Sequence, residues 1–208
     1  MKIVSWIIRG CNHHRKVKTL AKKVRKERSD VLFLQETKCS FEVMEKLRKK
    51  IWKGSRVMAT DVDRMEGGIV VLWHQKSINL SDWRANNLSL MVNFKFLETG
   101  AKGTLVNVYG PITFPQKSSF MRLLNWMKEI THEGKWIIGG YYNIIFFLRE
   151  NKGSPHVLEK FQEEFREFLS HSPLVDVETG DGWFTWKNKH GERILFPLEF
   201  TYYFCRKT

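Results

Sequence analysis

The chain has few cysteines, no long uncharged segment and a shortage of acidic residues, and each shortage narrows the classes of protein it fits. Its three cysteines, Cys11, Cys39 and Cys205, are widely spaced without a Cys-x-x-Cys pair, so neither a disulfide framework nor a zinc site is predicted. The uncharged segment at residues 136–148 is too short and too interrupted by glycine to cross a bilayer. Arg9 interrupts the apolar N-terminal segment, so no signal peptide is expected. We therefore expect an intracellular protein of the nucleus or cytoplasm, without membrane association.

The shortage of acidic residues leaves the chain strongly basic. It has 35 Lys and Arg residues against 22 Asp and Glu residues, a formal net charge of +13 at pH 7. Basic side chains that neutralise phosphates gain affinity by releasing counterions. The charge therefore favours DNA or another nucleic acid as partner, rather than a small-molecule cofactor. With 42% hydrophobic residues, the chain can form one packed domain over residues 1–208, which we expect to be monomeric.

The first quarter of the chain alternates apolar runs with amphipathic patterns. Residues 2–8 and 31–35 are apolar runs ended by polar clusters, which predicts two strands. A helix between them is predicted by apolar residues at helical spacing, namely Val17, Leu20, Ala21 and Val24. A second helix is predicted by Phe41, Met44, Leu47 and Ile51.

The rest of the chain adds further strands and two more helices. Short β-rich runs between turn residues predict an antiparallel meander with strands at 56–60, 68–73, 78–83, 88–96 and 104–108. A helix over 120–130, a strand at 136–138, a helix over 158–169 and short strands around 183–186 and 199–204 follow. Two sheets packed face to face, with helices on their outer sides, would bury all the apolar faces. We therefore predict an α/β fold, a four-layer α/β/β/α sandwich.

Three predicted strands end in polar side chains suited to phosphate chemistry. Glu36 follows the second strand, Tyr109 ends the meander, and Asn143 follows what is predicted to be a tight Gly139-Gly140 turn. Hydrolysis of a phosphodiester needs a divalent cation, a base and hydrogen-bond donors, and Mg²⁺ prefers carboxylate oxygens. We interpret Glu36 as a metal ligand, Tyr109 as a phosphate-binding phenol and Asn143 as a phosphate-orienting amide. Taken singly, each has a plainer interpretation: a solvated acid, a core tyrosine and a turn residue.

These residues lie in motifs that follow one another along nearly the whole chain. The motifs are Ser5-Trp-Ile-Ile-Arg-Gly10, Leu34-Gln-Glu-Thr-Lys38, residues 67–73, Val108-Tyr-Gly-Pro111, Trp136-Ile-Ile-Gly-Gly140 with Asn143, residues 182–188 and Arg193-Ile-Leu195. The series resembles the endonuclease/exonuclease/phosphatase superfamily, and more closely the endonuclease domain of plant LINE-type non-LTR retroelements. The resemblance implies a deoxyribonuclease I-like fold, Mg²⁺ as cofactor, DNA nicking as the activity, and catalytic roles for Glu36, Tyr109 and Asn143.

The chain departs from the family's motifs where they carry catalysis. Ile7 stands where the family has a metal-site asparagine, and Tyr141 stands where it has the aspartate that activates the nucleophilic water. Phe196 and Pro197 replace an Asp-Arg pair, and the family's closing Ser-Asp-His segment is not present, so we expect the last strand to be missing. The hypothesis is therefore an impaired endonuclease with weakened Mg²⁺ binding. The alternatives are a non-catalytic nucleic-acid-binding domain and a decayed gene product without activity.

Two further clusters have both a functional and a plain interpretation. Cys11, His13 and His14 could bind a metal, or they are ordinary loop residues. The segment Lys22-Lys-Val-Arg-Lys-Glu-Arg28 could be a nuclear-localisation or nucleic-acid patch, or it is a solvated helix face.

Overall fold

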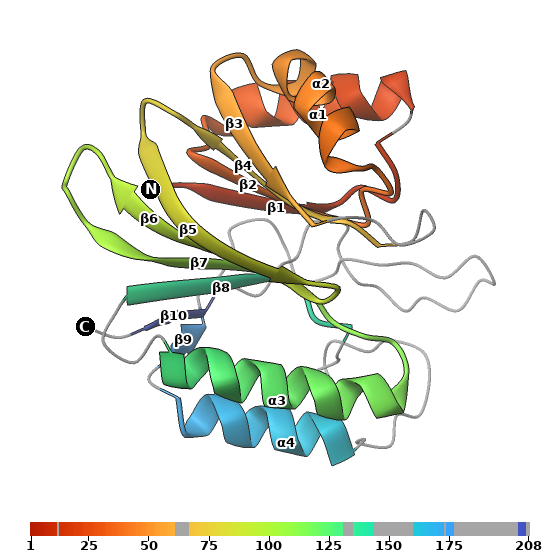
Figure 1. Ribbon diagram of the computed structural model, residues 1–208, viewed down its shortest axis with the longest axis vertical. Helices are drawn as coiled ribbons and strands as arrows, with labels where there is room; N and C mark the ends of the chain where they lie inside the picture. Colours follow the sequence, from red (N-terminus) through yellow and green to blue (C-terminus); the bar gives the residue numbers. More distant parts are fainter. Residues whose placement is uncertain are drawn as a thin grey trace.

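Two β-sheets face each other at the centre of the fold, and two helices cover the outer side of each sheet (Figure 1). The computed structural model describes residues 1–11, 13–60, 67–130, 135–143, 160–172, 174–176 and 204–206. The first sheet has the order β1-β2-β4-β3, with bounds Ile3–Ile7, Val31–Gln35, Ile69–His74 and Ser55–Ala59. The second has the order β5-β6-β7-β8-β10-β9, with bounds Ile78–Asn86, Ser89–Phe96, Lys102–Tyr109, Lys135–Tyr141, Phe204–Arg206 and Leu174–Asp176.

The helices fall into two pairs that lie on opposite outer faces. Helices α1 (His14–Glu27) and α2 (Phe41–Ile51) cover the first sheet, whereas α3 (Phe114–Ile130) and α4 (Lys160–Ser170) cover the second (Figure 1). No helix in the described ranges is long and apolar enough to cross a membrane. The predicted four-layer α/β/β/α sandwich is confirmed.

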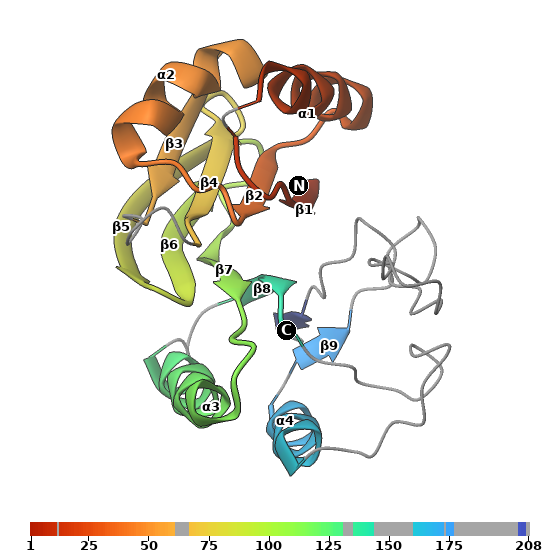
Figure 2. The same cartoon turned by 90° about the vertical axis from the view of Figure 1, so that its right-hand side faces the viewer.

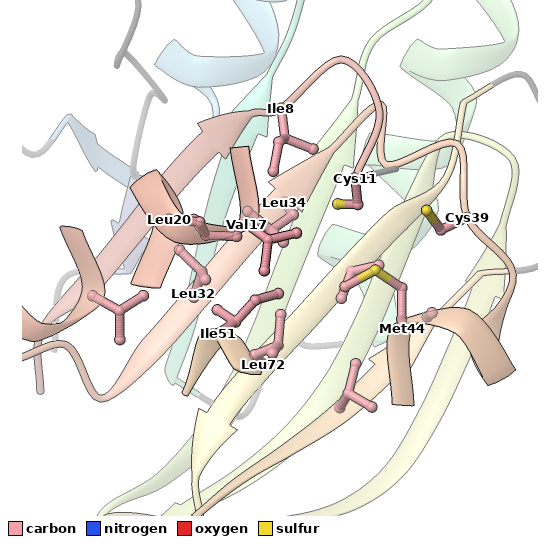
Figure 3. Packing of buried hydrophobic residues seen from close by; sticks show 14 residues of the cluster. Ile8, Cys11, Val17, Leu20, Leu32, Leu34, Cys39, Met44, Ile51 and Leu72 are labelled. Atoms are coloured by element: carbon pink, nitrogen blue, oxygen red, sulfur yellow. The ribbon is translucent and has the colours of Figure 1, made fainter. Parts of the chain in front are cut away.

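Strand β2 shows how the layers are held together, because it is buried on both faces. Val31 and Phe33 pack between the two sheets, whereas Leu32 and Leu34 pack under α1 and α2. Alternate residues of a strand point to opposite faces, so a strand covered on both sides is apolar throughout. The outer core beneath α1 and α2 is drawn in Figure 3, where Leu20 and Val17 of α1 lie over Leu32 and Leu34.

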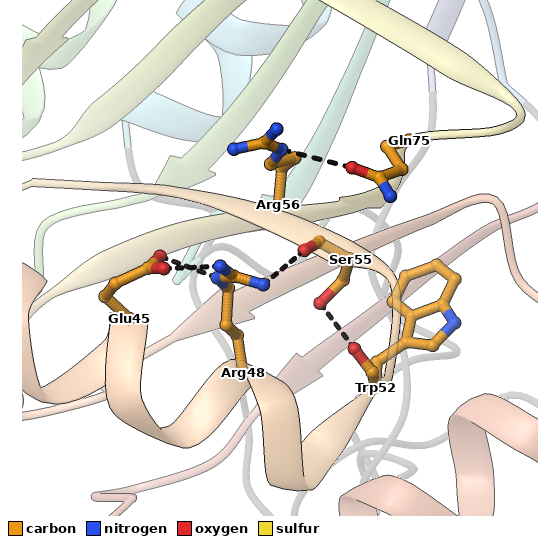
Figure 4. Close-up of polar contacts among 6 residues, drawn as sticks. All are labelled: Glu45, Arg48, Trp52, Ser55, Arg56 and Gln75. Carbon is orange, nitrogen blue, oxygen red and sulfur yellow. Dashed lines mark hydrogen bonds and ion pairs between the residues drawn. The ribbon is translucent and has the colours of Figure 1, made fainter.

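Hydrogen bonds fix the end of α2 to the strand that follows it. Arg48 forms an ion pair with Glu45 at 2.5 Å and donates a hydrogen bond to the carbonyl of Ser55 at 2.7 Å (Figure 4). The Ser55 hydroxyl donates to the carbonyl of Trp52, also at 2.7 Å. These contacts satisfy carbonyls at and just after the helix end, where intrahelical partners run out.

Each sheet contains one parallel strand pair, and both pairs place their carboxyl ends at the same end of the molecule. Strands β1 and β2 are parallel, with Ile7 paired to Gln35, and β7 and β8 are parallel, with Tyr109 paired to Tyr141. Parallel neighbours need a crossover connection, and α1 and α3 supply these crossovers. Figure 2 looks onto these carboxyl ends, where the predicted site residues lie.

The meander predicted over residues 56–109 is partly wrong, because the chain changes sheets within it. Strands β3 and β4 belong to the first sheet, and β5, β6 and β7 belong to the second. Strand β4 already pairs with β2 on one side and β3 on the other. It has no free edge left, so the chain crosses to the facing sheet after His74 and begins the second sheet at Ile78.

The predicted Gly139-Gly140 turn is also wrong, because both glycines lie inside β8. Gly139 pairs with Asn107 and Gly140 with Val108 of β7. A Cβ atom on Gly140 would lie 2.0 Å from the carbonyl oxygen of Val108, and the φ angle of Gly140 is +139°. Glycine is therefore required here by the close approach of two strands. The predicted strand at 183–186, and Phe196 and Pro197, lie outside the described residues.

Candidate active site

The structure brings Glu36 and Tyr109 into contact across the two sheets. Glu36 follows β2, Tyr109 is the last residue of β7, and the Tyr109 phenol donates a hydrogen bond to Oε1 of Glu36. The two residues are 73 positions apart in the sequence. Both side chains are half-buried, so they line a site that solvent reaches.

Asn143 and Tyr141 complete this group from the end of β8. The Asn143 amide donates a hydrogen bond to the carbonyl of Gly110, next to Tyr109. The backbone N–H of Gly110 in turn donates to the carbonyl of Tyr141 at 2.6 Å. The rings of Tyr141 and Tyr109 are stacked, with centroids 6.2 Å apart and planes at 23°. The three residues predicted to form a site are thus close together, with Tyr141 beside them.

Unusual backbone conformations cluster around this group. Arg9, Glu36, Lys38 and Asn143 have φ angles of 51°, 53°, 52° and 53°, in the left-handed region that non-glycine residues rarely adopt. Such conformations cost free energy and persist where the surrounding structure requires them, often at functional sites. All four residues follow strand ends at the same end of the molecule.

Electrostatics keep both tyrosines protonated at neutral pH. Burial raises the pKa of the Tyr109 phenol well above its ordinary value, and the hydrogen bond to the Glu36 carboxylate raises it further. Burial also raises the pKa of Tyr141, against the opposing charge of the nearby Arg9 guanidinium. A water-activating base has to accept a proton near neutral pH. Tyr141 is a neutral phenol there, and therefore cannot replace an aspartate in that role.

A buried polar network that was not predicted from the sequence links the two sheets beneath the site. Gln35, on β2, donates hydrogen bonds to Ser5 Oγ at 3.0 Å and to Oδ1 of Asn107, on β7, at 2.6 Å. The Asn107 amide donates to the carbonyls of Leu34 and Val70 at 3.2 and 2.9 Å. The available signal was a lone asparagine inside an apolar strand. Because Gln35 precedes Glu36 and Asn107 lies two residues before Tyr109, the network holds both site residues in position.

The second metal hypothesis, with Cys11, His13 and His14, finds no support in the geometry. Cys11 is buried beside Cys39 at one end of the core in Figure 3, whereas His13 and His14 are exposed. Burial, with a smaller effect of the neighbouring Cys39 thiol, raises the pKa of Cys11 to about 12. The thiolate is the metal-binding form of cysteine, so Cys11 is a poor ligand at neutral pH.

The donor atoms around Glu36 can be compared with what a divalent cation needs. No three His, Cys, Asp or Glu side chains form a metal-binding cluster in the described parts of the chain, and among those residues Glu36 is the carboxylate that contacts Tyr109. Mg²⁺ keeps several waters and is often held by one or two carboxylates together with substrate phosphates. The donor set therefore fits a weakly held, largely hydrated Mg²⁺. Ile7, at the end of β1, contributes no polar atom from its side chain.

Comparison with known proteins relates the chain to retroelement and nuclease proteins. No family model matches it. It is 27% identical over 190 residues to the Transposon TX1 uncharacterized 149 kDa protein of Xenopus laevis, an alignment covering 90% of this chain but 14% of that protein. The chain therefore spans about one seventh of that relative's length.

Solved structures with the same fold include nucleases and a phosphatase. An AP endonuclease from Leishmania major has a TM-score of 0.75 and 15% identity, covering 99% of this chain and 78% of its own. The endonuclease domain of TRAS1, a telomere-specific non-LTR retrotransposon, has a TM-score of 0.69 and 13% identity. The match covers 99% of this chain and 84% of that one. A mannosyl-6-phosphatase from Bacteroides thetaiotaomicron has a TM-score of 0.69 and 14% identity, and the match covers 99% of this chain and 85% of that one. The chain thus has the deoxyribonuclease I-like fold of the endonuclease/exonuclease/phosphatase proteins, as its motifs predicted, and its sequence resembles that of a transposon protein.

Proposed function

We propose that this chain is a single retroelement-derived domain with a phosphodiesterase site of the DNA endonuclease type, in which catalysis is impaired. The observation that carries the proposal is the contact between Glu36 and Tyr109 across the two sheets, with Asn143 beside it. The fold alone does not choose the substrate, since phosphatases share it with nucleases. The similarity to a transposon protein and the net charge of +13 favour DNA.

The residues present suggest how a phosphodiester would bind. The Tyr109 phenol has one hydrogen to donate, and it forms a hydrogen bond with Oε1 of Glu36. If a phosphate oxygen accepted the hydrogen bond of Tyr109 instead, Glu36 would be the residue to hold Mg²⁺, and a bound Mg²⁺ would supply polarisation of the phosphate. Asn143 orients the phosphate, and the exposed Arg9 and Lys38 add positive charge at the neighbouring strand ends.

Impairment follows from the groups that are replaced. Tyr141 occupies the place of the water-activating aspartate and stays neutral, because burial raises its pKa. Ile7 removes a polar atom from the end of β1, and Phe196 would remove a further catalytic group. The loss of one acid or base group typically lowers the rate by about 10²–10⁴-fold. We therefore expect nicking close to the uncatalysed background.

A plasmid-nicking assay in Mg²⁺ tests this proposal. The natural chain should nick no faster than its Glu36→Gln variant. A restored chain carrying Ile7→Asn, Tyr141→Asp and Phe196→Asp, with a Ser-Asp-His segment appended, should regain nicking by at least about 10²-fold. Its matched control is the same restored chain with Glu36→Gln, which should be silent.

Two outcomes would contradict the proposal. Robust, Glu36-dependent nicking by the natural chain would show that catalysis is intact. A folded restored chain that does not nick DNA would argue against a nuclease site. If the folded restored chain does not nick DNA but binds it in a salt-dependent manner, the result would favour a non-catalytic nucleic-acid-binding domain, which the net positive charge supports. If it does not bind DNA either, the remaining interpretation is a gene product without activity.

A further inference from the structure

The positive charge is concentrated on one helix rather than spread evenly over the fold. Helix α1 has seven Lys or Arg residues and one acidic residue among its 14 residues. On the opposite outer face, α4 has two basic and three acidic residues among 11. The two helix layers are therefore electrostatically different, although each covers a sheet in the same way.

Four of the α1 cations form a row that points away from the core. Val17, Leu20, Ala21 and Val24 are the buried residues of this helix. The exposed residues Arg15, Lys18, Lys22 and Lys26 are spaced by three and four positions, so they follow one another along the opposite face. We call these four residues the outward row. They span 11 helical steps of about 1.5 Å, or roughly 16 Å.

The cations of the outward row are available for a partner. Within the described residues none of the four makes an ion pair, whereas other cations of this layer are engaged. Lys16 donates hydrogen bonds to backbone carbonyls, Lys23 lies 5.3 Å above the ring of Trp6, and Arg48 is paired with Glu45. The row therefore consists of basic residues whose charges no described ion pair uses.

The row begins next to the candidate active site. Lys16 Nζ donates hydrogen bonds to the carbonyls of Ile8 and Arg9, at 3.0 and 2.5 Å, and so ties the start of α1 to the loop after β1. Because α1 connects two parallel strands, it runs back from their carboxyl ends toward their amino ends. Successive cations of the outward row thus lie progressively farther from the site.

We propose that the outward row is a phosphate-binding surface that holds the backbone of a nucleic acid extending away from the active site. One strand of B-DNA carries a phosphate every 3.4 Å of helix axis, so about five phosphates pass along a row of this length. The contacts would be independent of sequence, because every nucleotide carries the same phosphate whatever its base. The choice of nucleic acid as the polyanion rests on the proposed function.

Binding of a fluorescent duplex oligonucleotide, measured by anisotropy in EDTA over a series of salt concentrations, tests this surface without cleavage. The variant Arg15→Gln/Lys18→Gln/Lys22→Gln/Lys26→Gln should bind more weakly. Four lost phosphate contacts should make the slope of log K against log salt shallower by about 3–4. Glutamine has nearly the helix propensity of lysine and arginine, so α1 should stay folded, which circular dichroism checks.

A matched control removes four exposed charges from the same layer, at the positions Lys46, Lys49, Lys50 and Lys53. Their replacement by Gln should change the slope by less than about 1, because these residues lie on α2 and just after it and not on the outward row. An unchanged slope in the outward-row variant, or an equal change in both variants, would overturn the proposal. Nicking assays do not enter this test, so loss of the proposed catalytic function would leave its result intact.

Discussion

Replacing Asn107 tests how the two sheets are held together beneath the site. Its side chain is fully buried, its amide donates to the carbonyls of Leu34 and Val70, and its Oδ1 accepts from Gln35. The change Asn107→Leu approximately keeps the volume and removes all three hydrogen bonds. It also leaves one N–H of Gln35 without its partner, although the bond from Gln35 to Ser5 remains.

The expected size of the effect follows from these contacts. Each hydrogen bond contributes about 1 kcal/mol net, and a buried donor without a partner costs about 1–3 kcal/mol. Burial of the apolar leucine offsets about 1–2 kcal/mol of this loss. We therefore expect Asn107→Leu to lower the free energy of unfolding by about 3 kcal/mol, a large share of the roughly 5–15 kcal/mol typical of a domain.

Urea unfolding followed by circular dichroism measures this change, with two comparisons. Asn79→Leu, at an exposed position of β5, should change the free energy of unfolding by less than about 0.5 kcal/mol. The double variant Gln35→Leu/Asn107→Leu should lose about 1–2 kcal/mol less than the sum of the single variants, because the stranded donor is gone. An Asn107→Leu protein as stable as the natural chain, or a strictly additive double variant, would refute the reasoning.

Two more predictions concern the strand ends around the site. Gly140→Ala should lower the free energy of unfolding by more than about 3 kcal/mol, because its Cβ would lie 2.0 Å from the Val108 carbonyl oxygen. The control Gly100→Ala, whose Cβ would meet nothing within 4 Å, should lower the free energy of unfolding by about 1–2 kcal/mol because Gly100 has a positive φ. Equal losses of stability for the two variants in urea titrations would contradict the close approach of Gly140 to Val108. The raised pKa of Tyr109 predicts that stability is unaffected by this group below about pH 10 and falls above it, as the unfolded state releases the proton first. The urea midpoint of the Tyr109→Phe variant should therefore fall less steeply between about pH 10 and 11 than that of the natural chain. Parallel pH curves for the two proteins would contradict a raised pKa of Tyr109.

The elements around the site were largely predictable because their signals are local. Strands β1 and β2 lie within one residue of their predicted bounds, and the four residues predicted to form the buried face of α1 are its buried residues. The helix predicted from Phe41, Met44, Leu47 and Ile51 is α2, although Phe41 is 38% exposed at its start. The convergence of Glu36, Tyr109 and Asn143 was expected from strand ends and from family motifs, and in the fold Tyr109 contacts Glu36 while Asn143 binds the carbonyl of the neighbouring Gly110.

Strand pairing and the buried polar links depended on residues far apart in the chain. Whether a strand continues a meander depends on which edges are already paired, and β4 had none free. Gln35 and Asn107 are 72 positions apart, so no local pattern could show that each satisfies the other. Gly139 and Gly140 looked like a turn, but their role depends on the distance to β7.

The amino-acid sequence by itself determined the periodicity of each helix and strand, the positive charge and the chemical groups available at the strand ends, because these depend on residue type and spacing alone. The tertiary structure decided which groups meet: the phenol of Tyr109 with the carboxylate of Glu36, the neutral Tyr141 beside them, and the outward row of α1 free of ion pairs among the described residues. Hydrogen bonds and charge effects act over a few ångströms in space, and only folding brings residues of different strands within that range.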